Sequence, residues 1–371
     1  MNGFIKFMHR AARPVWVGLN VLIAGITLLS AFGGDIDPNT LPFAGIATMT
    51  FPVWYLLTAV CLVADLVVNR WLAIVPALAL LIAIETFLDF CPLNFGRHEV
   101  PPDAVGREFK ILSYNTLSFR DESVRPIDPR CNRTMHAVLA SGADAVVLIE
   151  YENQGPLAKF VPQAQIDSLH AIYPYFSRGK RGTVLYSKTP IARLTPPPGA
   201  DLRGYFEGFR TFLSKERKPV NIFAVHLESI GLSDNDKELY REITDKAPER
   251  VNVGKVRNQL VEKLYAAFIK RAEQARELRD YVEAEGGNAI VCGDFNDVPS
   301  CYTIKTLEKI GLQDAYAKVG FGPTITFNAP HFFFRIDHVL WRGDFKAVKI
   351  QRGNVPSSDH YPLLTTFVFD D

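Results

Sequence analysis

The chain has 371 residues, with 41 Lys and Arg against 40 Asp and Glu, and 48% of its residues are hydrophobic. This length allows one large domain with an appendage or two ordinary domains, and the net charge of +1 excludes a global basic field of the kind that attracts nucleic acid. The five cysteines show no CxxC zinc signature and no spacing typical of a disulfide framework. We therefore expect free or buried thiols.

The N-terminal quarter of the chain is apolar, and charged residues become frequent only after it. A helix that crosses the hydrocarbon core of a bilayer needs roughly 20 apolar residues. On this basis we expect about three transmembrane helices, over about 15–33, 42–68 and 71–90. The third is the weakest, because Glu85 and Asp89 lie in its last turns. A cleaved signal peptide is the alternative for the first, and a soluble bundle would need polar faces that these segments lack.

Basic residues are gathered before the first predicted helix, as Lys6, Arg10 and Arg13. The loop after that helix carries Asp35 and Asp37, and Arg70 lies in the next turn. Because basic residues favour the cytoplasmic side, we expect a cytoplasmic N-terminus. An odd number of spans then places the rest of the chain on the outer or periplasmic side of a cell or inner membrane.

The composition divides the chain into a membrane anchor (1–95), a linker (96–107) and a domain (108–371). Short apolar or alternating runs predict strands, and longer polar runs with apolar residues at helical spacing predict helices. Strands are expected at 109–114, 145–149, 183–187, 220–225, 289–291, 336–341 and 363–369, with helices at 133–140 and 257–284. This pattern favours an α/β or α+β domain.

Polar side chains recur where the predicted strands begin or end: Asn115, Glu150, His226, Asp294, Asn296, Asp337, Asp359 and His360. Active sites are commonly built from such positions and the adjoining loops. Carboxylate and amide oxygens are ligands that suit a hard cation such as Mg²⁺. The sequence therefore predicts a site that holds a divalent cation with room for a phosphate.

Six short blocks that contain these residues occur in a fixed order: Ser113-Tyr114-Asn115, 144–150, Val225-His226-Leu227, Gly293-Asp294-Phe295-Asn296, Arg335-Ile336-Asp337-His338 and Ser358-Asp359-His360. Together they resemble the endonuclease/exonuclease/phosphatase superfamily, which includes pancreatic deoxyribonuclease, abasic-site endonucleases, neutral sphingomyelinases and inositol polyphosphate 5-phosphatases. The resemblance covers about residues 108–371. It implies a four-layer sandwich in which two central β-sheets are flanked by helices, with the site at one edge.

The resemblance implies three metal-site residues. Glu150 matches the main metal carboxylate of the superfamily, Asn115 matches its Asn beside metal and phosphate, and Asp359 matches a carboxylate that binds or supports the metal. Leu117 stands where the abasic-site endonucleases carry an Asp, so one potential ligand is absent. Mg²⁺ is the expected ion, with Mn²⁺ as a substitute and Ca²⁺ as a third option outside the cytoplasm.

Catalytic roles are implied in the same way. Asp294 matches the residue that orients or deprotonates the attacking water, and Asn296 matches its phosphate-binding partner. His360 matches the catalytic imidazole, with Asp337 as the carboxylate that raises its pKa. His226 matches the second histidine of the deoxyribonuclease and sphingomyelinase branches.

Arg335 stands two residues before Asp337 and is a weak candidate for binding substrate phosphate, with a structural salt bridge as the alternative. The expected function is metal-dependent hydrolysis of a phosphodiester or phosphomonoester by in-line attack of water. A nuclease acting on DNA or RNA is the alternative, and an inactive membrane-tethered binding module is a further one.

Expected partners are a phosphate-ester substrate (a lipid headgroup, a small phosphorylated molecule or nucleic acid) and the lipid bilayer, with no protein partner. The polar stretch 234–272 is a candidate for contact with substrate or membrane, and a solvated surface helix is the alternative.

Overall fold

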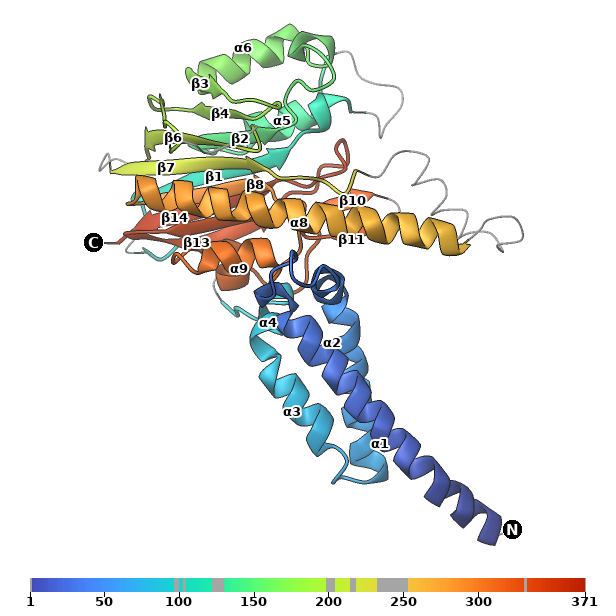
Figure 1. Ribbon diagram of the computed structural model, residues 1–371. Coiled ribbons are helices and arrows are strands. Elements are labelled where there is room, and N and C mark those ends of the chain that lie inside the picture. Colours follow the sequence, from blue (N-terminus) through green and yellow to red (C-terminus); the bar gives the residue numbers. More distant parts are fainter. Residues whose placement is uncertain are drawn as a thin grey trace.

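A computed structural model describes residues 2–96, 100–102, 105–121, 130–197, 204–213, 218–231, 253–329 and 332–370. The strands and most helices form one layered domain, and the N-terminal helices form a bundle that extends from it (Figure 1). Residues 234–252 of the candidate contact stretch lie outside the described residues, and 253–272 form the first part of a long helix, α8.

Two six-stranded sheets form the centre of the domain. The first contains, in spatial order, β13 (Phe345–Arg352), β14 (Leu363–Phe369), β1 (Glu108–Asn115), β2 (Ala145–Ile149), β4 (Val184–Ser187) and β3 (Tyr175–Arg178). The second contains β5 (Ala192–Arg193), β6 (Phe206–Phe212), β7 (Pro219–His226), β8 (Ala289–Asp294), β12 (Asp337–Arg342) and β9 (Gln313–Asp314). A separate hairpin pairs β10 (Phe327–Ala329) with β11 (Phe332–Phe334).

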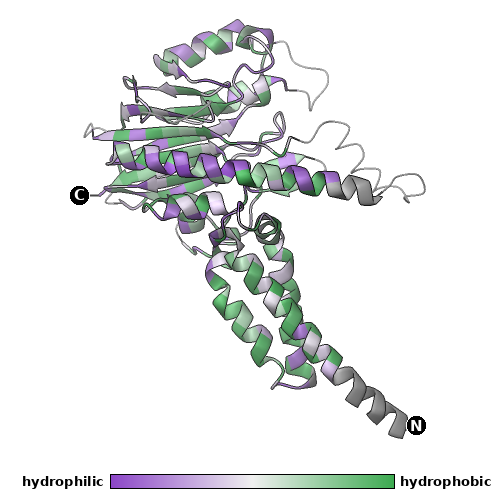
Figure 2. Ribbon diagram, in the orientation of Figure 1, coloured by the Kyte–Doolittle hydropathy of each residue, from purple (hydrophilic) through white to green (hydrophobic). Residues whose placement is uncertain are grey.

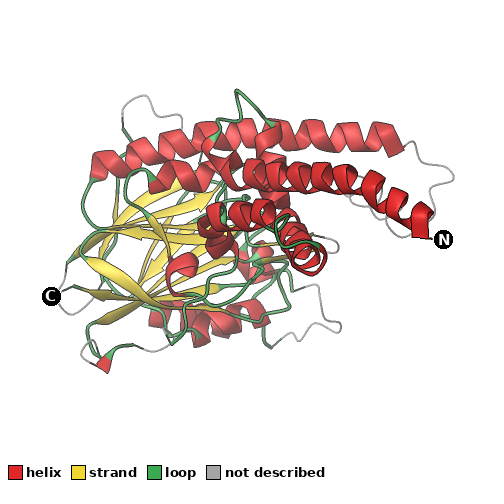
Figure 3. Ribbon diagram, turned by 90° about the horizontal axis from the view of Figure 1, so that it is seen from below, coloured by secondary structure: helices red, strands yellow, loops and turns green. Residues whose placement is uncertain are grey.

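Helices cover the outer faces of both sheets, so that the strands lie between helical layers (Figure 3). The first sheet packs on α5 (Arg133–Ala140) and α6 (Gln163–Ile172). The second packs on α8 (Val253–Glu285) and α9 (Tyr302–Glu308), and the short α10 (Ala315–Val319) joins the core between the sheets. Short 3-10 turns are η1 (Gly33–Asp35), η3 (Leu117–Phe119) and η4 (Leu157–Lys159).

The alternation of side chains along the central strands explains this layering. In β1, Phe109 and Ile111 enter the core between the two sheets, whereas Leu112 and Tyr114 enter the core beneath α5 and α6. A strand that is apolar on both faces must be covered on both. The two sheets flanked by helices confirm the predicted fold class, and each predicted strand and helix of the domain is present.

The N-terminal bundle consists of α1 (Asn2–Phe32), α2 (Phe43–Val68), α3 (Ile74–Ile82) and α4 (Ile84–Phe90), and apolar side chains dominate it (Figure 2). Among the described residues, two stretches are long and apolar enough to cross a membrane, Pro14–Asp35 and Phe43–Val67.

The prediction of one continuous spanning helix over 71–90 is wrong, because that segment is two short helices in series and neither is long enough to span a membrane by itself. The backbone of Ala83 (φ −86°, ψ 9°) ends α3 and begins α4. The second of these helices belongs to the junction with the domain, since its Asp89 accepts a hydrogen bond from Ser300 and pairs with Lys305.

Candidate active site

The strand register of the second sheet brings three of the predicted site residues into one row. In the parallel pair β7–β8, His226 lies opposite Asp294, and in the antiparallel pair β8–β12, Asp294 lies opposite Asp337. Register partners on adjacent strands point to the same face of a sheet. These three side chains therefore leave the end of the second sheet together.

Asn115 connects this row to the first sheet. It ends β1, and its side-chain Nδ2 donates to Asp294 Oδ2 at 3.1 Å and to Glu150 Oε1 at 3.3 Å. Glu150 follows the parallel strand β2 and has a left-handed backbone (φ 57°), and its Oε1 lies 3.8 Å from His226 Nε2. A non-glycine residue in this region of φ is uncommon and marks a tightly determined position.

His360 forms the most strongly polarised pair of the site. Its Nδ1 lies 2.8 Å from Asp337 Oδ2, and its Nε2 lies 3.6 Å from Asp294 Oδ2. Burial lowers the pKa of His360, but the Asp337 and Asp294 carboxylates outweigh it and raise that pKa to about 10. The imidazole is therefore positively charged at neutral pH. Burial also raises the pKa of Asp294, which favours acceptance of a proton.

Asn296 lies on the loop that follows β8 and also has a left-handed backbone (φ 52°). Its backbone N–H donates to Asp294 Oδ1 at 2.8 Å, and its Nδ2 donates to the carbonyl of Leu227 at 3.1 Å. These bonds orient the Asp294 carboxylate and join the loop after β8 to the loop after β7.

The donor set of the site fits a divalent cation. Among the described residues, Asp359 Oδ1 is buried and has no hydrogen-bond partner, and a buried carboxylate oxygen without a partner is costly. Potential ligand atoms of Asp294, Asp337 and His360 lie within 4.8 Å of one another. His360 Nδ1 already bonds Asp337, and a hard cation prefers oxygen ligands, which Glu150, Asn115 and Asp359 also carry.

Arg335 lies in a buried salt bridge. The residue is 4% exposed, its Nη1 lies 2.7 Å from Asp314 Oδ2, and its Nη2 donates to the carbonyl of Asp89 at 2.6 Å. These bonds hold the guanidinium at the junction between the domain and the N-terminal bundle, in agreement with the salt-bridge alternative.

Two supporting residues had no predicted role. Ser358 Oγ donates to the carbonyl of Asn115 at 2.9 Å and accepts from the backbone N–H of His360 at 3.2 Å. Thr326 Oγ1 accepts from the backbone N–H of Asp337 at 3.0 Å. Ser358 belongs to the Ser-Asp-His block and was therefore detectable, whereas Thr326 stands in a loop with no recognisable motif.

Family models match both parts of the chain. The model of the Endonuclease/Exonuclease/phosphatase family matches residues 112–360, about two thirds of the chain. That of a domain of unknown function, DUF8431, matches residues 13–90. No curated protein matches the chain.

Similar solved structures include an endonuclease/exonuclease/phosphatase from Beutenbergia cavernae, 20% identical over 71% of this chain and 72% of that chain, with a TM-score of 0.48. A family protein from Bacteroides thetaiotaomicron is 16% identical over 71% and 98%, with a TM-score of 0.43. TDP2 from D. rerio, complexed with a single strand DNA product, is 14% identical over 70% and 98%, with a TM-score of 0.43.

Proposed function

Because the chain belongs to the endonuclease/exonuclease/phosphatase family, whose members are phosphoesterases and nucleases, we propose that it is a divalent-metal-dependent phosphoesterase held at a membrane. The observation that carries the proposal is the continuous set of contacts from Glu150 through Asn115 and Asp294 to the His360–Asp337 pair. An inactive scaffold would not need this complete set.

Each residue has a separate role in the in-line attack of water on a phosphate ester. Asp294 orients the water and accepts its proton, which its raised pKa favours. The protonated His360 faces the phosphate and stabilises the charge that develops in the transition state. Asn296 and His226 bind the phosphoryl oxygens or assist the leaving oxygen.

Glu150, Asn115 and Asp359 would hold the cation, with Mg²⁺ as the expected ion. When bound, a divalent cation supplies charge that polarises a phosphoryl oxygen. The support for this assignment is the oxygen-rich donor set and the unpaired, buried Asp359 Oδ1 among the described residues.

Hydrolysis of bis-p-nitrophenyl phosphate by the full-length protein tests the proposal. We expect activity that is abolished by chelator and restored by Mg²⁺ or Mn²⁺. Glu150→Gln should lose most activity and regain part of it at high Mg²⁺, because a neutral amide balances the cation's charge poorly. Glu152→Gln is the matched control, since that carboxylate pairs with Arg178 instead. Wild-type activity that survives excess chelator would refute the metal assignment.

The bundle exposes apolar side chains on its surface and buries polar ones between its helices, as a bilayer requires. Large apolar side chains such as Leu56, Val63 and Leu81 point outward and are 63–68% exposed. The polar Asp65 is buried between helices, where it accepts hydrogen bonds from Trp16 at 2.6 Å and Asn20 at 2.8 Å. Ionisable groups inside membranes face the bundle interior and pair there. This pattern supports an integral membrane anchor.

The path of the chain supports a domain on the side opposite the N-terminus. The end of α1 and the turn η1 lie beside the domain, whereas the N-terminus and the turn between α2 and α3 lie at the far end of the bundle (Figure 1). The broken pair α3–α4 returns the chain to the domain. Because Lys and Arg favour the cytoplasm, this path supports a domain outside it. A reporter active only outside the cytoplasm, fused after Asp371, should be active, and a silent reporter there would refute this orientation.

The substrate that fits this placement is a phosphate ester at the membrane surface. A chain with a net charge of +1 lacks the basic excess on which affinity for polymeric nucleic acid depends. A tether raises the effective concentration of headgroups without a need for high intrinsic affinity. Full-length protein in phospholipid vesicles should release headgroups, and rapid cleavage of DNA without turnover of lipid would favour a nuclease instead.

A further inference from the structure

The loop from Asp294 to Cys301 carries two of the proposed active residues in a strained backbone. Asn296 (φ 52°) and Ser300 (φ 58°) both adopt the left-handed region without being glycine. A left-handed conformation is unfavourable for residues other than glycine and persists only where the surroundings determine it. The contacts that hold this loop therefore decide where Asp294 and Asn296 point.

The membrane anchor supplies contacts at the Ser300 end of the loop. The turn η1 packs so closely there that a Cβ atom on Gly34 would lie 1.8 Å from the carbonyl oxygen of Ser300. Ser300 Oγ donates to Asp89 Oδ2 on α4, and Lys305 Nζ lies 3.4 Å from the same oxygen. Two separate segments of the anchor thus clamp one residue of the loop.

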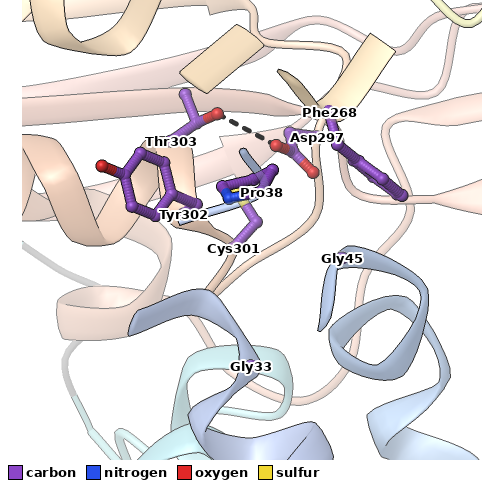
Figure 4. A pocket seen from close by; sticks show the side chains of 8 residues that line it. All are labelled: Gly33, Pro38, Gly45, Phe268, Asp297, Cys301, Tyr302 and Thr303. Carbon is purple, nitrogen blue, oxygen red and sulfur yellow. Dashed lines mark hydrogen bonds between the residues drawn. The ribbon is translucent and has the colours of Figure 1, made fainter. Parts of the chain in front are cut away.

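Contacts between the anchor and the domain also reach the middle of the 294–301 loop. Gly33, Pro38 and Gly45 of the anchor line a small pocket together with Asp297, Cys301, Tyr302 and Thr303 of the domain (Figure 4). The Asp297 carboxylate accepts from Thr303 Oγ1 at 3.0 Å and lies 3.4 Å from Nε of Arg271, a residue on α8 that is 1% exposed.

Arg271 carries this contact across to the loop that follows β7. Its Nη1 donates to the carbonyl of Glu228 at 2.9 Å, and Gln274 one turn later accepts from the backbone N–H of Glu228 at 2.9 Å. Glu228 stands two residues after His226. The helix itself is packed against the anchor, because a Cβ on Gly45 would lie 2.6 Å from the ring of Phe268.

We propose that the membrane anchor is a positioning element of the active site: the Gly33–Gly34 turn and Asp89 hold the 294–301 loop in the conformation that aims Asp294 and Asn296 at the substrate. None of these anchor residues touches substrate. The inference rests on the proposed hydrolysis for its kinetic test. It predicts that a defect in anchor packing is felt in turnover, even with a small soluble substrate that needs no membrane.

The test compares two glycines of the anchor in the full-length protein. Gly34→Ala forces a methyl group into the Ser300 carbonyl, and the backbone of Gly34 is not left-handed, so contact alone is tested. Gly25→Ala is the matched control, since a Cβ there meets no described atom within 4 Å. We expect Gly34→Ala to lower kcat on bis-p-nitrophenyl phosphate by about ten- to a hundredfold, the scale of a small misplacement of reacting groups. KM should change little, and Gly25→Ala should match wild type.

A second pair of variants covers a failure of Gly34→Ala to fold. Asp89→Ala removes the Ser300 and Lys305 contacts, and Glu85→Ala, one turn earlier on the same helix and exposed, is its control. We expect the kcat loss in the first and not in the second. Folded Asp89→Ala protein with wild-type kcat would overturn the inference.

Hydrogen–deuterium exchange of the full-length variants separates this inference from the proposed function. Faster exchange confined to residues 294–301 in Gly34→Ala or Asp89→Ala, and absent in both controls, sustains the positioning role even if wild type does not hydrolyse the diester. Unchanged exchange in that loop overturns it, whatever the activity.

Discussion

Two buried histidine–aspartate pairs lie on opposite faces of strand β12, and the contrast between them bears on the catalytic role proposed for one of them. His360 Nδ1 and Asp337 Oδ2 are 2.8 Å apart, and His338 Nδ1 and Asp314 Oδ2 are also 2.8 Å apart. All four residues are buried. By distance and burial alone the two pairs are equivalent.

The other ring nitrogen distinguishes them. His338 Nε2 hydrogen-bonds the carbonyl of Asp297 at 3.0 Å, and Asp314 is shared with Arg335. His360 Nε2 instead faces a second carboxylate, Asp294, at 3.6 Å. The His338–Asp314 pair has therefore used its hydrogen-bonding capacity within the fold. The His360–Asp337 pair retains a charged N–H that can face a phosphate.

The largest expected effect is on turnover. His360→Ala should lower kcat by about a thousandfold, within the range for loss of a proton-transferring or charge-stabilising side chain. His338→Ala should instead lower the free energy of unfolding and reduce kcat far less. Steady-state kinetics and guanidinium unfolding of both variants make the comparison. Equal losses of kcat would remove the distinction between the pairs.

Asp337→Asn should cost no more than His360→Ala, because Asp337 is proposed to act through the imidazole. The double variant should then be little worse than His360→Ala alone, and additive losses would show independent roles. Asp337→Asn should also move the alkaline decline of kcat to lower pH. Burial lowers the pKa of His360 and Asp337 raises it, so the protonated ring, which wild type loses only near pH 10, should be lost earlier.

The smallest effect concerns the structural pair and appears in stability. Burial raises the pKa of Asp314, but Arg335 and His338 outweigh burial and hold that pKa well below its usual value of 3.8. A depressed carboxyl pKa stabilises the fold above the unfolded-state pKa, and this contribution is lost as pH falls through the folded-state pKa.

Asp314→Asn should therefore lower the free energy of unfolding at pH 7 by about 3 kcal/mol, as expected when a buried ion pair loses one partner. The difference from wild type should shrink below about pH 4. Guanidinium unfolding at pH 7 and pH 3 measures it, and a constant difference at the two pH values would argue against the ionised Asp314.

The sequence predicted both members of the His360–Asp337 pair, but it left the role of Arg335, three residues before His338, open between phosphate binding and a salt bridge. The block Arg335-Ile336-Asp337-His338 suggests one cluster, yet strand alternation sends Asp337 toward the site and His338 to the other face. The sequence of this four-residue block does not show which face of the strand belongs to the site. The strand β13 was also missed, because a register shift between Ala347 and Lys349 breaks its alternation.

By itself, the sequence determined the features that depend on neighbouring residues: buried strands as continuous apolar runs, the polar residues at their ends and two helices long enough for a bilayer. Only the tertiary structure decided which polar residues meet, that the helix predicted over 71–90 is broken at Ala83, and that Gly34 and Asp89 reach the catalytic loop. The physical reason is range. Burial and strand alternation follow from local patterns. The partner of a buried charge or of a close-packed glycine instead comes from a segment tens to hundreds of residues away, and only the packing of the whole chain determines which segment that is.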